Sequence, residues 1–250
     1  MSTVILLSLL QGIAEFLPIS SSGHLVIAQN LLGVKDGGMA LDIFLHFGTL
    51  LSIAVYYRKT LWNMFVHLDL EFMAKLIVSA IPTVIVYYIF KKQIDSAFEN
   101  PKVVGAFLMF TGSVLMGTKY LPIGTKNVSF IRALLMGLGQ AFAILPGVSR
   151  SGMTLAVARS GKIDPSKSAE FSFLMSAPLI LGGTLLELLK CGGTPDLGGF
   201  PWYFVGFGVV LAFLSGLAAL YVLERTLKSR WFWLFGPYCI FAGLLTLFMI

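Results

Sequence analysis

Two short polar segments interrupt an otherwise apolar sequence, and both carry side chains suited to chemistry on a phosphate group. The first, residues 11–24, contains Glu15, His24 and three consecutive serines, and the second, residues 146–152, contains Arg150 between two serines. A carboxylate or a histidine can transfer a proton, and a serine or a histidine can attack phosphorus. The Arg150 guanidinium can bind two phosphate oxygens at once, which a lysine cannot do. These residue types together predict a phosphate or diphosphate site.

The spacing within each segment supports this interpretation. Gln11 and Glu15 are four residues apart, so on a helix they share one face and point toward one place. The polar run from Ser20 to His24 breaks that helix, and the next helix presents free backbone N–H groups at its N-terminus, which bind anions. Residues 146–152 repeat this arrangement. The residues expected to bind substrate are Gln11, Ser20, Ser22, Gly23, Ser149, Ser151 and Gly152.

Each of these features also has a structural explanation. A serine–glycine run is often a turn or a helix cap, a buried glutamate can hydrogen-bond a neighbouring helix, and a lone histidine can be a core residue. Asp42 and His46 begin a later apolar segment and are interpreted as cap and interface residues. Function is favoured for the two polar segments because their costly polar groups all fall at two breaks that an internal repeat relates.

The composition places the chain among helical membrane proteins. Of its 250 residues, 57% are hydrophobic and 12% are charged, whereas soluble domains carry about 25% charged residues. This excludes a soluble enzyme and an extended disordered chain. The net charge of +6 comes from lysines and arginines in short clusters between apolar segments. That pattern is typical of membrane topology, so no nucleic-acid partner is expected.

The elements that must position the polar segments are apolar helices of two kinds. Residues 3–32 and 130–158 are broken by the polar runs, and their second arms are too short to cross a hydrocarbon core of about 30 Å. We expect two helical hairpins that enter the membrane and turn back, which is allowed where the broken backbone is buried in protein. The predicted fold class is all-α integral membrane, with two re-entrant hairpins plus six transmembrane helices at residues 41–57, 72–90, 102–118, 168–189, 202–223 and 232–250.

An internal repeat relates the two halves of the chain. A shift of 129 residues places Gln11 on Gln140, and residues 20–23 on residues 149–152. A shift of 131 residues matches Gly105, Phe110 and Gly112 to Gly236, Phe241 and Gly243. Residues 1–120 and 129–250 are therefore interpreted as two repeats in one integrated membrane domain, each with one hairpin and three spans. Because three is odd, the second repeat is expected to be inverted.

The distribution of basic residues predicts the orientation. With this topology one face has twelve lysines and arginines and the other has five. The positive-inside rule makes the richer face cytoplasmic, so the first hairpin opens to the outside. The richer face holds Arg58, Lys59, Lys75, Lys119, Lys126, Arg132, Arg159, Lys162, Lys167, Arg225, Lys228 and Arg230, and the other holds Lys35, Lys91, Lys92, Lys102 and Lys190.

The two polar segments also carry a family resemblance. They read Gln-Gly-Ile-Ala-Glu-Phe-Leu-Pro-Ile-Ser-Ser-Ser-Gly-His and Pro-Gly-Val-Ser-Arg-Ser-Gly. Over essentially its whole length, the chain resembles the undecaprenyl-diphosphate phosphatases of the bacitracin-resistance type. The resemblance implies that Ser21, His24 and Arg150 are the catalytic serine, histidine and arginine, and that Glu15 is the second acid of the first motif. It further implies hydrolysis of undecaprenyl diphosphate to undecaprenyl phosphate, which recycles the lipid carrier of cell-wall synthesis.

The resemblance also implies a cofactor, partners and a location. A divalent cation, Mg²⁺ or Ca²⁺, would be held by Glu15 and Gln11, and Gln11 is the amide version of the first acid in the motif. The expected partners are the polyprenyl diphosphate lipid and the bilayer, and a homodimer is an option that the sequence leaves open. The expected location is the bacterial inner membrane, crossed several times, with the active site opening to the extracytoplasmic side.

Two questions stay open at the level of sequence. In one mechanism Ser21 attacks phosphorus with Glu15 or His24 as base; in another, His24 attacks or activates water. The alternative function is a lipid flippase or a transporter of a phosphorylated lipid, because inverted repeats with broken helices are typical of transporters.

Overall fold

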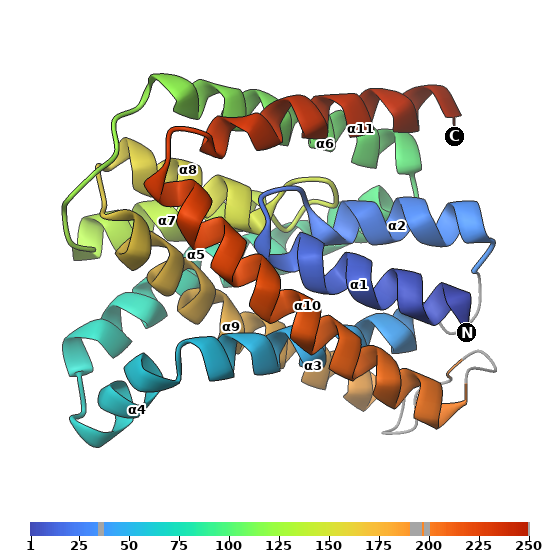
Figure 1. The fold of residues 1–250 in the computed structure, drawn as a ribbon, viewed down its shortest axis with the longest axis horizontal. Coiled ribbons are helices and arrows are strands. Elements are labelled where there is room, and N and C mark those ends of the chain that lie inside the picture. The colour runs from blue at the N-terminus through green and yellow to red at the C-terminus, as the bar shows by residue number, and fades with distance from the viewer. Residues whose placement is uncertain (35–37, 191–196, 198–200, 250) are drawn as a thin grey trace.

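The computed structural model describes residues 1–34, 38–190, 197 and 201–249, and the regular elements in this part are helices apart from one β-bridge between Lys126 and Ile163 (Figure 1). Lys35, one of the expected orienting charges, lies outside the described residues. The elements are α1 (Ser2–Phe16), α2 (Ser21–Leu32), α3 (Gly38–Tyr56), α4 (Arg58–Val66), α5 (Leu70–Phe98), α6 (Pro101–Gly117), η1 (Thr118–Tyr120), α7 (Phe130–Phe142), α8 (Arg150–Ser160), α9 (Pro165–Lys190), α10 (Trp202–Lys228), η2 (Phe232–Leu234) and α11 (Phe235–Met249).

The helices confirm an all-α protein of membrane type. Four of them are long and apolar enough to cross a bilayer, at Leu70–Phe98, Pro101–Tyr120, Pro165–Leu186 and Trp202–Lys228. The other two expected spans are matched by shorter apolar helices, Leu41–Tyr56 and Phe232–Phe248. Large apolar side chains are exposed along most of the helices, as a lipid-facing surface requires.

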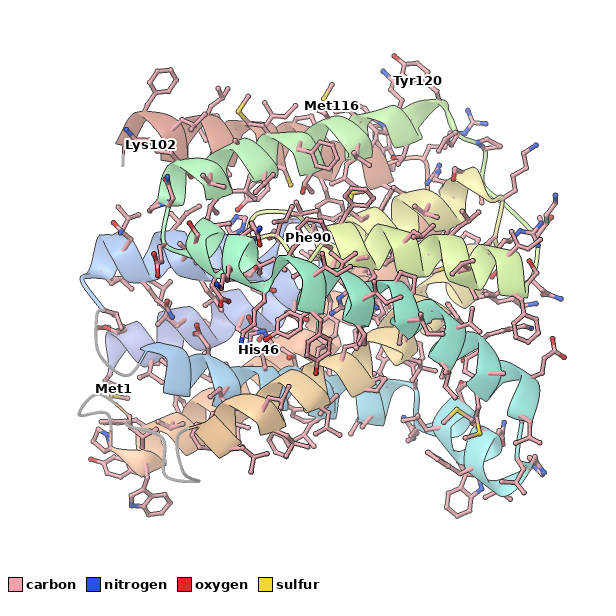
Figure 2. All side chains as sticks on the ribbon, turned by 180° about the vertical axis from the view of Figure 1, so that it is seen from behind. Met1, His46, Phe90, Lys102, Met116 and Tyr120 are labelled. Atoms are coloured by element: carbon pink, nitrogen blue, oxygen red, sulfur yellow. The ribbon has the colours of Figure 1, made fainter. Side chains whose placement is uncertain are left out.

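Two elements differ from the sequence-based expectation. The span expected at residues 72–90 continues as α5 to Phe98, with non-helical backbone at Phe90 (Figure 2). The lysines after Phe90 end the apolar run without ending the helix. The short helix α4 was not expected, since its mixture of charged and apolar residues shows no long apolar run.

The two polar segments form the turns of helical hairpins, α1–α2 and α7–α8, and these turns lie side by side in the middle of the molecule (Figure 1). Each turn contains a residue with positive φ, Ser20 at 71° and Gly147 at 94°. The second arm of the later hairpin, α8, is longer than the expected residues 153–158, because Ser149 caps the helix at its true start.

The helix ends gather at two ends of the molecule. Both chain termini and the outer ends of α1 and α2 lie at one end, here called the terminal end, and the outer ends of α7 and α8 lie at the opposite end (Figure 1). Met1 and Lys102 are at the terminal end, and Tyr120 is at the opposite end (Figure 2). Helix α1 packs against α10 and α7 packs against α5, so each hairpin is supported by a helix from the other half of the chain.

Glycines let α6 and α11 approach closely. A Cβ atom at Gly112 would lie 2.6 Å from the carbonyl oxygen of Gly236, and one at Gly105 would lie 2.9 Å from that of Gly243. These glycines are the ones that the shift of 131 residues matches in the sequence. Backbones in membrane proteins approach in this way where small residues line the interface.

We predict that Gly112→Ala destabilises the protein by about 1–3 kcal/mol, because the added methyl group overpacks the α6–α11 contact. Gly117→Ala, at the end of the same helix, is the matched control, since a Cβ there meets no atom within 4 Å. The free energy of unfolding, measured in detergent by tryptophan fluorescence, checks the difference. Equal stability of the two variants would contradict this account of the contact.

Candidate active site

The buried end of α1 holds a carboxylate around which the other polar groups gather. Glu15 is 7% exposed and Gln11 is fully buried. The Gln11 amide Nε2 donates to Glu15 Oε2 over 3.1 Å, and Ser21 Oγ donates to the same oxygen over 2.6 Å. The chain can return in this way because α1 ends at Phe16, just before Pro18 forces the backbone out of the helix.

The other hairpin supplies the positive charge. Arg150 Nη2 donates to Glu15 Oε1 over 2.6 Å, and Arg150 Nη1 donates to Ser176 Oγ over 2.5 Å. The guanidinium also lies over the ring of Phe173, 5.5 Å from its centroid. The structure therefore brings three of the predicted catalytic residues, Glu15, Ser21 and Arg150, into one hydrogen-bonded chain.

Further contacts fix the two turns against each other. Ser151 Oγ donates to the backbone carbonyl of Leu17 over 3.0 Å. A Cβ atom at Gly23 would lie 3.0 Å from Gly147 Cα, so the absence of a side chain at Gly23 lets the two turns approach closely. The turn of the α1–α2 hairpin thus fixes the position of the turn of the α7–α8 hairpin.

Two predicted substrate-binding serines have a structural role. Ser20 Oγ accepts a hydrogen bond from the Gly23 N–H over 3.3 Å, and Ser149 Oγ accepts one from the Gly152 N–H over 3.1 Å. Both hydroxyls are therefore helix N-caps, as the structural explanation of a serine–glycine run expects. The caps use the third N–H of each helix, and the two before it have no hydrogen-bond partner among the described residues.

His24 lies apart from the carboxylate and is held from both sides. Its Nδ1 is 2.9 Å from the backbone carbonyl oxygen of Ser20, and its Nε2 is 2.8 Å from the hydroxyl of Tyr238. A carbonyl can only accept, so Nδ1 carries the proton in neutral His24 and Nε2 accepts from Tyr238. The two rings are also stacked, with centroids 5.6 Å apart.

The structure adds three residues that the sequence analysis did not assign to the site. His46 Nε2 lies 3.8 Å from Glu15 Oε2, although the sequence interpretation made His46 an interface residue. Ser176 and Tyr238 contact Arg150 and His24, as described. His46 could have been recognised as a titratable group at membrane depth, whereas nothing in the sequence pairs Ser176 or Tyr238 with its partner.

Comparison with known proteins agrees with the two motifs. Residues 4–245 match the family described as bacitracin resistance protein BacA. Curated relatives named undecaprenyl-diphosphatase include those of Thermotoga sp. (strain RQ2), 39% identical over 97% of this chain and 98% of the relative, and Desulforapulum autotrophicum, 34% identical over 97% and 96%. The relative from Rhodopirellula baltica is 38% identical over 98% and 96%. The chain belongs to the BacA family.

The donors at Glu15 fit a divalent cation only if most of its ligands come from elsewhere. In the described part of this BacA-family chain, no three His, Cys, Asp or Glu side chains form a metal-binding group. Glu15 is the one carboxylate of the cluster and is already paired with Arg150. However, Gln11 Oε1 is a buried hard oxygen with no hydrogen-bond partner among the described residues. Gln11 and Glu15 therefore fit a cation that takes its other ligands from a diphosphate and water.

We predict that Glu15 and Arg150 are energetically coupled. Glu15→Gln should cost about 3–5 kcal/mol of stability, because it leaves the Arg150 guanidinium largely buried without its counter-charge. Arg150→Met removes the charge, so the double variant should be more stable than the sum of the two losses predicts. Unfolding free energies of the four proteins in detergent give the coupling energy. Strict additivity would show that the ion pair does not hold the hairpins.

Proposed function

We propose that the protein hydrolyses undecaprenyl diphosphate to undecaprenyl phosphate and inorganic phosphate. The chain belongs to the BacA family, and its curated relatives are named undecaprenyl-diphosphatases. The observation that carries the mechanism is the hydrogen bond of 2.6 Å from Ser21 Oγ to Glu15 Oε2. It joins a nucleophile to a base on two different helices, within a cluster that an arginine also reaches.

Ser21 is the proposed nucleophile and Glu15 is its base. Ser21 Oγ forms a bond to the terminal phosphorus, the bond from that phosphorus to the bridging oxygen breaks, and undecaprenyl phosphate leaves with the bridging oxygen. The hydroxyl proton passes to Glu15. Water then hydrolyses the phosphoserine and releases inorganic phosphate. Ser21 is half-buried while Glu15 is buried, so the hydroxyl is the accessible member of the pair.

Arg150 and the two helix N-termini provide the proposed charge stabilisation. The guanidinium binds the same carboxylate as the Ser21 hydroxyl, so it lies beside the attacking oxygen. The first N–H groups of α2 and α8 point to the region where the hairpin turns meet. Phosphoryl transfer depends mainly on such fixed positive groups, because charge accumulates on the transferring oxygens.

His24 is proposed to transfer a proton rather than to attack. In the structure both of its ring nitrogens have partners, Ser20 and Tyr238, and neither of these partners is Ser21. With Nδ1 protonated, Nε2 is the basic nitrogen, and it lies at the more exposed side of the site beside Tyr238. This position suits activation of the water that hydrolyses the phosphoserine.

We predict that Ser21→Ala lowers the rate of phosphate release by at least a thousandfold, because the nucleophile is lost. Ser22→Ala is the matched comparison: its hydroxyl contacts only Ser20 Oγ among the described residues, at 3.4 Å, so its loss should cost less than tenfold. Phosphate release from undecaprenyl diphosphate in detergent measures both. Similar rates for the two variants would remove Ser21 from the mechanism. No release by the wild-type protein would favour the flippase alternative, since detergent offers no second compartment.

A divalent cation, Mg²⁺ or Ca²⁺, is proposed to bind together with the substrate. Gln11 and Glu15 would hold it from the protein side, and the cation would neutralise charge on the diphosphate. Because the protein offers one carboxylate here, which Arg150 also neutralises, the free enzyme should bind the cation weakly and the substrate complex should bind it well.

We predict that Gln11→Glu tightens binding of the cation to the free enzyme, because it adds a second carboxylate beside Glu15, and leaves activity within about tenfold, or roughly 1.4 kcal/mol of barrier. Gln140→Glu is the matched control, because Gln140 is also buried with an unpaired Oε1. The residue four positions after Gln140 is Ile144, whereas the residue four positions after Gln11 is Glu15, so Gln140→Glu creates no carboxylate pair. Calorimetric titration of Mg²⁺ into each protein checks the prediction. Tight binding to wild type that survives Glu15→Gln would place the cation elsewhere.

We place the terminal end and the opposite end of the molecule on opposite sides of the membrane. The α1–α2 hairpin would enter from outside and the α7–α8 hairpin from the cytoplasm, with six spans around them in an inverted repeat. Contacts of α1 with α10 and of α7 with α5, which correspond under the sequence repeat, support this arrangement. The charge count supports an extracytoplasmic terminal end and therefore an active site reached from the outer leaflet of the inner membrane.

We predict opposite labelling of two single cysteines introduced into a variant without Cys191 and Cys239. Asn100→Cys, between α5 and α6 at the terminal end, should react with a membrane-impermeant maleimide in intact cells. Lys126→Cys, between α6 and α7, should react only after permeabilisation, because the positive-inside rule places it in the cytoplasm. The reverse labelling pattern would contradict the proposed orientation.

A further inference from the structure

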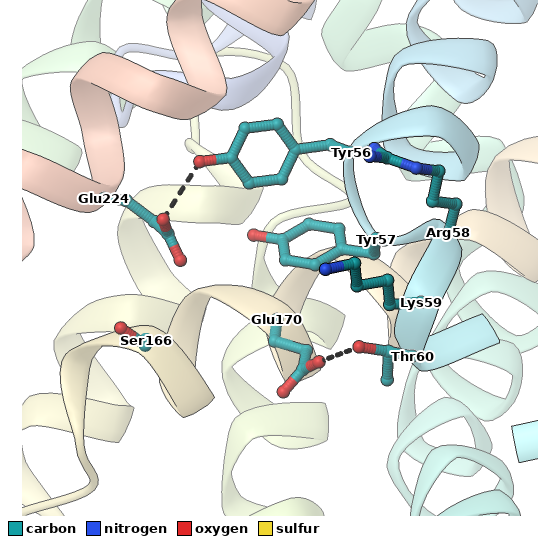
Figure 3. A pocket seen from close by; sticks show the side chains of 8 residues that line it. All are labelled: Tyr56, Tyr57, Arg58, Lys59, Thr60, Ser166, Glu170 and Glu224. Carbon is teal, nitrogen blue, oxygen red and sulfur yellow. Dashed lines mark hydrogen bonds between the residues drawn. The ribbon is translucent and has the colours of Figure 1, made fainter. Parts of the chain in front are cut away.

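A polar cavity lies toward the opposite end, away from the catalytic cluster. It measures about 400 Å³, which is within the usual range for small-molecule sites. Its walls come from the junction of α3 and α4, the start of α9 and the late part of α10 (Figure 3). Neither Glu15, Ser21 nor Arg150 lines it.

Two carboxylates face this cavity, and each has only one of its oxygens in a hydrogen bond with the described residues. Glu224 Oε2 accepts a hydrogen bond from the Tyr56 hydroxyl over 2.9 Å, and Glu170 Oε1 accepts one from Thr60 (Figure 3). The other oxygen of each carboxylate has no hydrogen-bond donor among the described residues. Neither glutamate forms an ion pair in that part of the chain, although two basic residues, Arg58 and Lys59, also line the cavity.

The cavity also contains unused donors. Tyr57 is 6% exposed, and its hydroxyl has no hydrogen-bond partner among the described residues. In Figure 3 this hydroxyl and the Lys59 amino group both point into the space between Glu170 and Glu224. A buried hydroxyl without a partner costs about 1–3 kcal/mol, so a ligand or water that accepts from Tyr57 is favoured.

These groups together fit a ligand that carries one positive and one negative charge. Glu170 and Glu224 can accept hydrogen bonds from a cation. The Tyr57 hydroxyl and Lys59 donate to an anion. A headgroup that joins a primary ammonium group to a phosphate ester satisfies both sets.

The surroundings indicate that this ligand is a lipid headgroup. The adjoining helix α4 exposes Trp62, Phe65 and Val66 next to Arg58 and Lys59. Aromatic and basic residues side by side are typical of the membrane–water interface. A bilayer with these residues at its interface brings the mouth of the cavity to the depth of the phospholipid headgroups.

We propose that this cavity binds the headgroup of phosphatidylethanolamine, with its ammonium group at Glu170 and Glu224 and its phosphate at Tyr57 and Lys59. The proposal goes beyond the phosphatase reaction and does not depend on it. The carboxylate pair distinguishes an ammonium that can donate hydrogen bonds from the trimethylated ammonium of phosphatidylcholine, which cannot. It also disfavours phosphatidylglycerol, which has no cation.

The test is a titration of the purified full-length protein in detergent, with bound lipid counted by native mass spectrometry. Phosphatidylethanolamine should bind at least tenfold more tightly than phosphatidylcholine or phosphatidylglycerol of the same chain length. Tyr57→Phe and Glu224→Gln should each weaken its binding by about tenfold, the effect of losing one hydrogen bond to a charged group. Tyr120→Phe and Glu99→Gln, which are exposed and outside the cavity, should change it by less than twofold.

Three outcomes would overturn the proposal. Equal binding of the three lipids would remove the headgroup selectivity. Unchanged binding to both Tyr57→Phe and Glu224→Gln would place the lipid elsewhere. Soluble phosphoethanolamine that displaces the lipid at equal concentration would make the ligand a free phosphoethanolamine rather than a lipid. Phosphate release from undecaprenyl diphosphate, measured on the same variants, shows that they are folded, because both substitutions keep the size of the side chain and neither residue forms a hydrogen bond or ion pair with Glu15, Ser21 or Arg150.

Discussion

The carboxylate of Glu15 is the interaction on which the rest of the site depends. It accepts from Gln11 on its own helix, from Ser21 on the next helix and from Arg150 on the other hairpin. A charge this deeply buried is costly unless it is paired and hydrogen-bonded. The surrounding donors remove that cost, and they do so only when the two hairpin turns meet. Assembly of the fold and assembly of the proposed catalytic group are therefore the same event.

The packing of the helices holds the two hairpin turns together. Each hairpin is supported by a long helix from the other half of the chain, α1 by α10 and α7 by α5. Glycines permit close approaches, at Gly23 beside Gly147 in the turns and at Gly112 beside Gly236 between α6 and α11. Because helices surround most of the broken backbone and leave Ser21 half-buried, its unpaired N–H groups can exist at membrane depth and remain available to an anion. A soluble scaffold would hydrate them.

Sequence reasoning predicted the parts of this arrangement that are local. The breaks near Pro18 and Pro146 could be predicted because proline and a polar run cannot continue an apolar helix, although α7 already ends at Phe142. The shared face of Gln11 and Glu15 follows from helix periodicity. The pairings across the fold could not. His46 was read as an interface residue, yet it faces Glu15, and the contact of His24 with Tyr238 joins residues with no shared pattern. The amphipathic helix α4 and the cavity beside it were missed because neither has a long apolar run or a motif.

The central claim is that Ser21, activated by Glu15, forms a covalent bond to phosphorus. The most direct measurement is a rapid acid quench of the wild-type protein during turnover of undecaprenyl diphosphate labelled in its terminal phosphate, followed by peptide mapping. Acid preserves phosphoserine and destroys phosphohistidine, so a parallel alkaline quench covers both. We expect the label on Ser21, in an amount that falls to background in Glu15→Gln. Label on His24, or turnover with no labelled protein under either quench, would contradict the account.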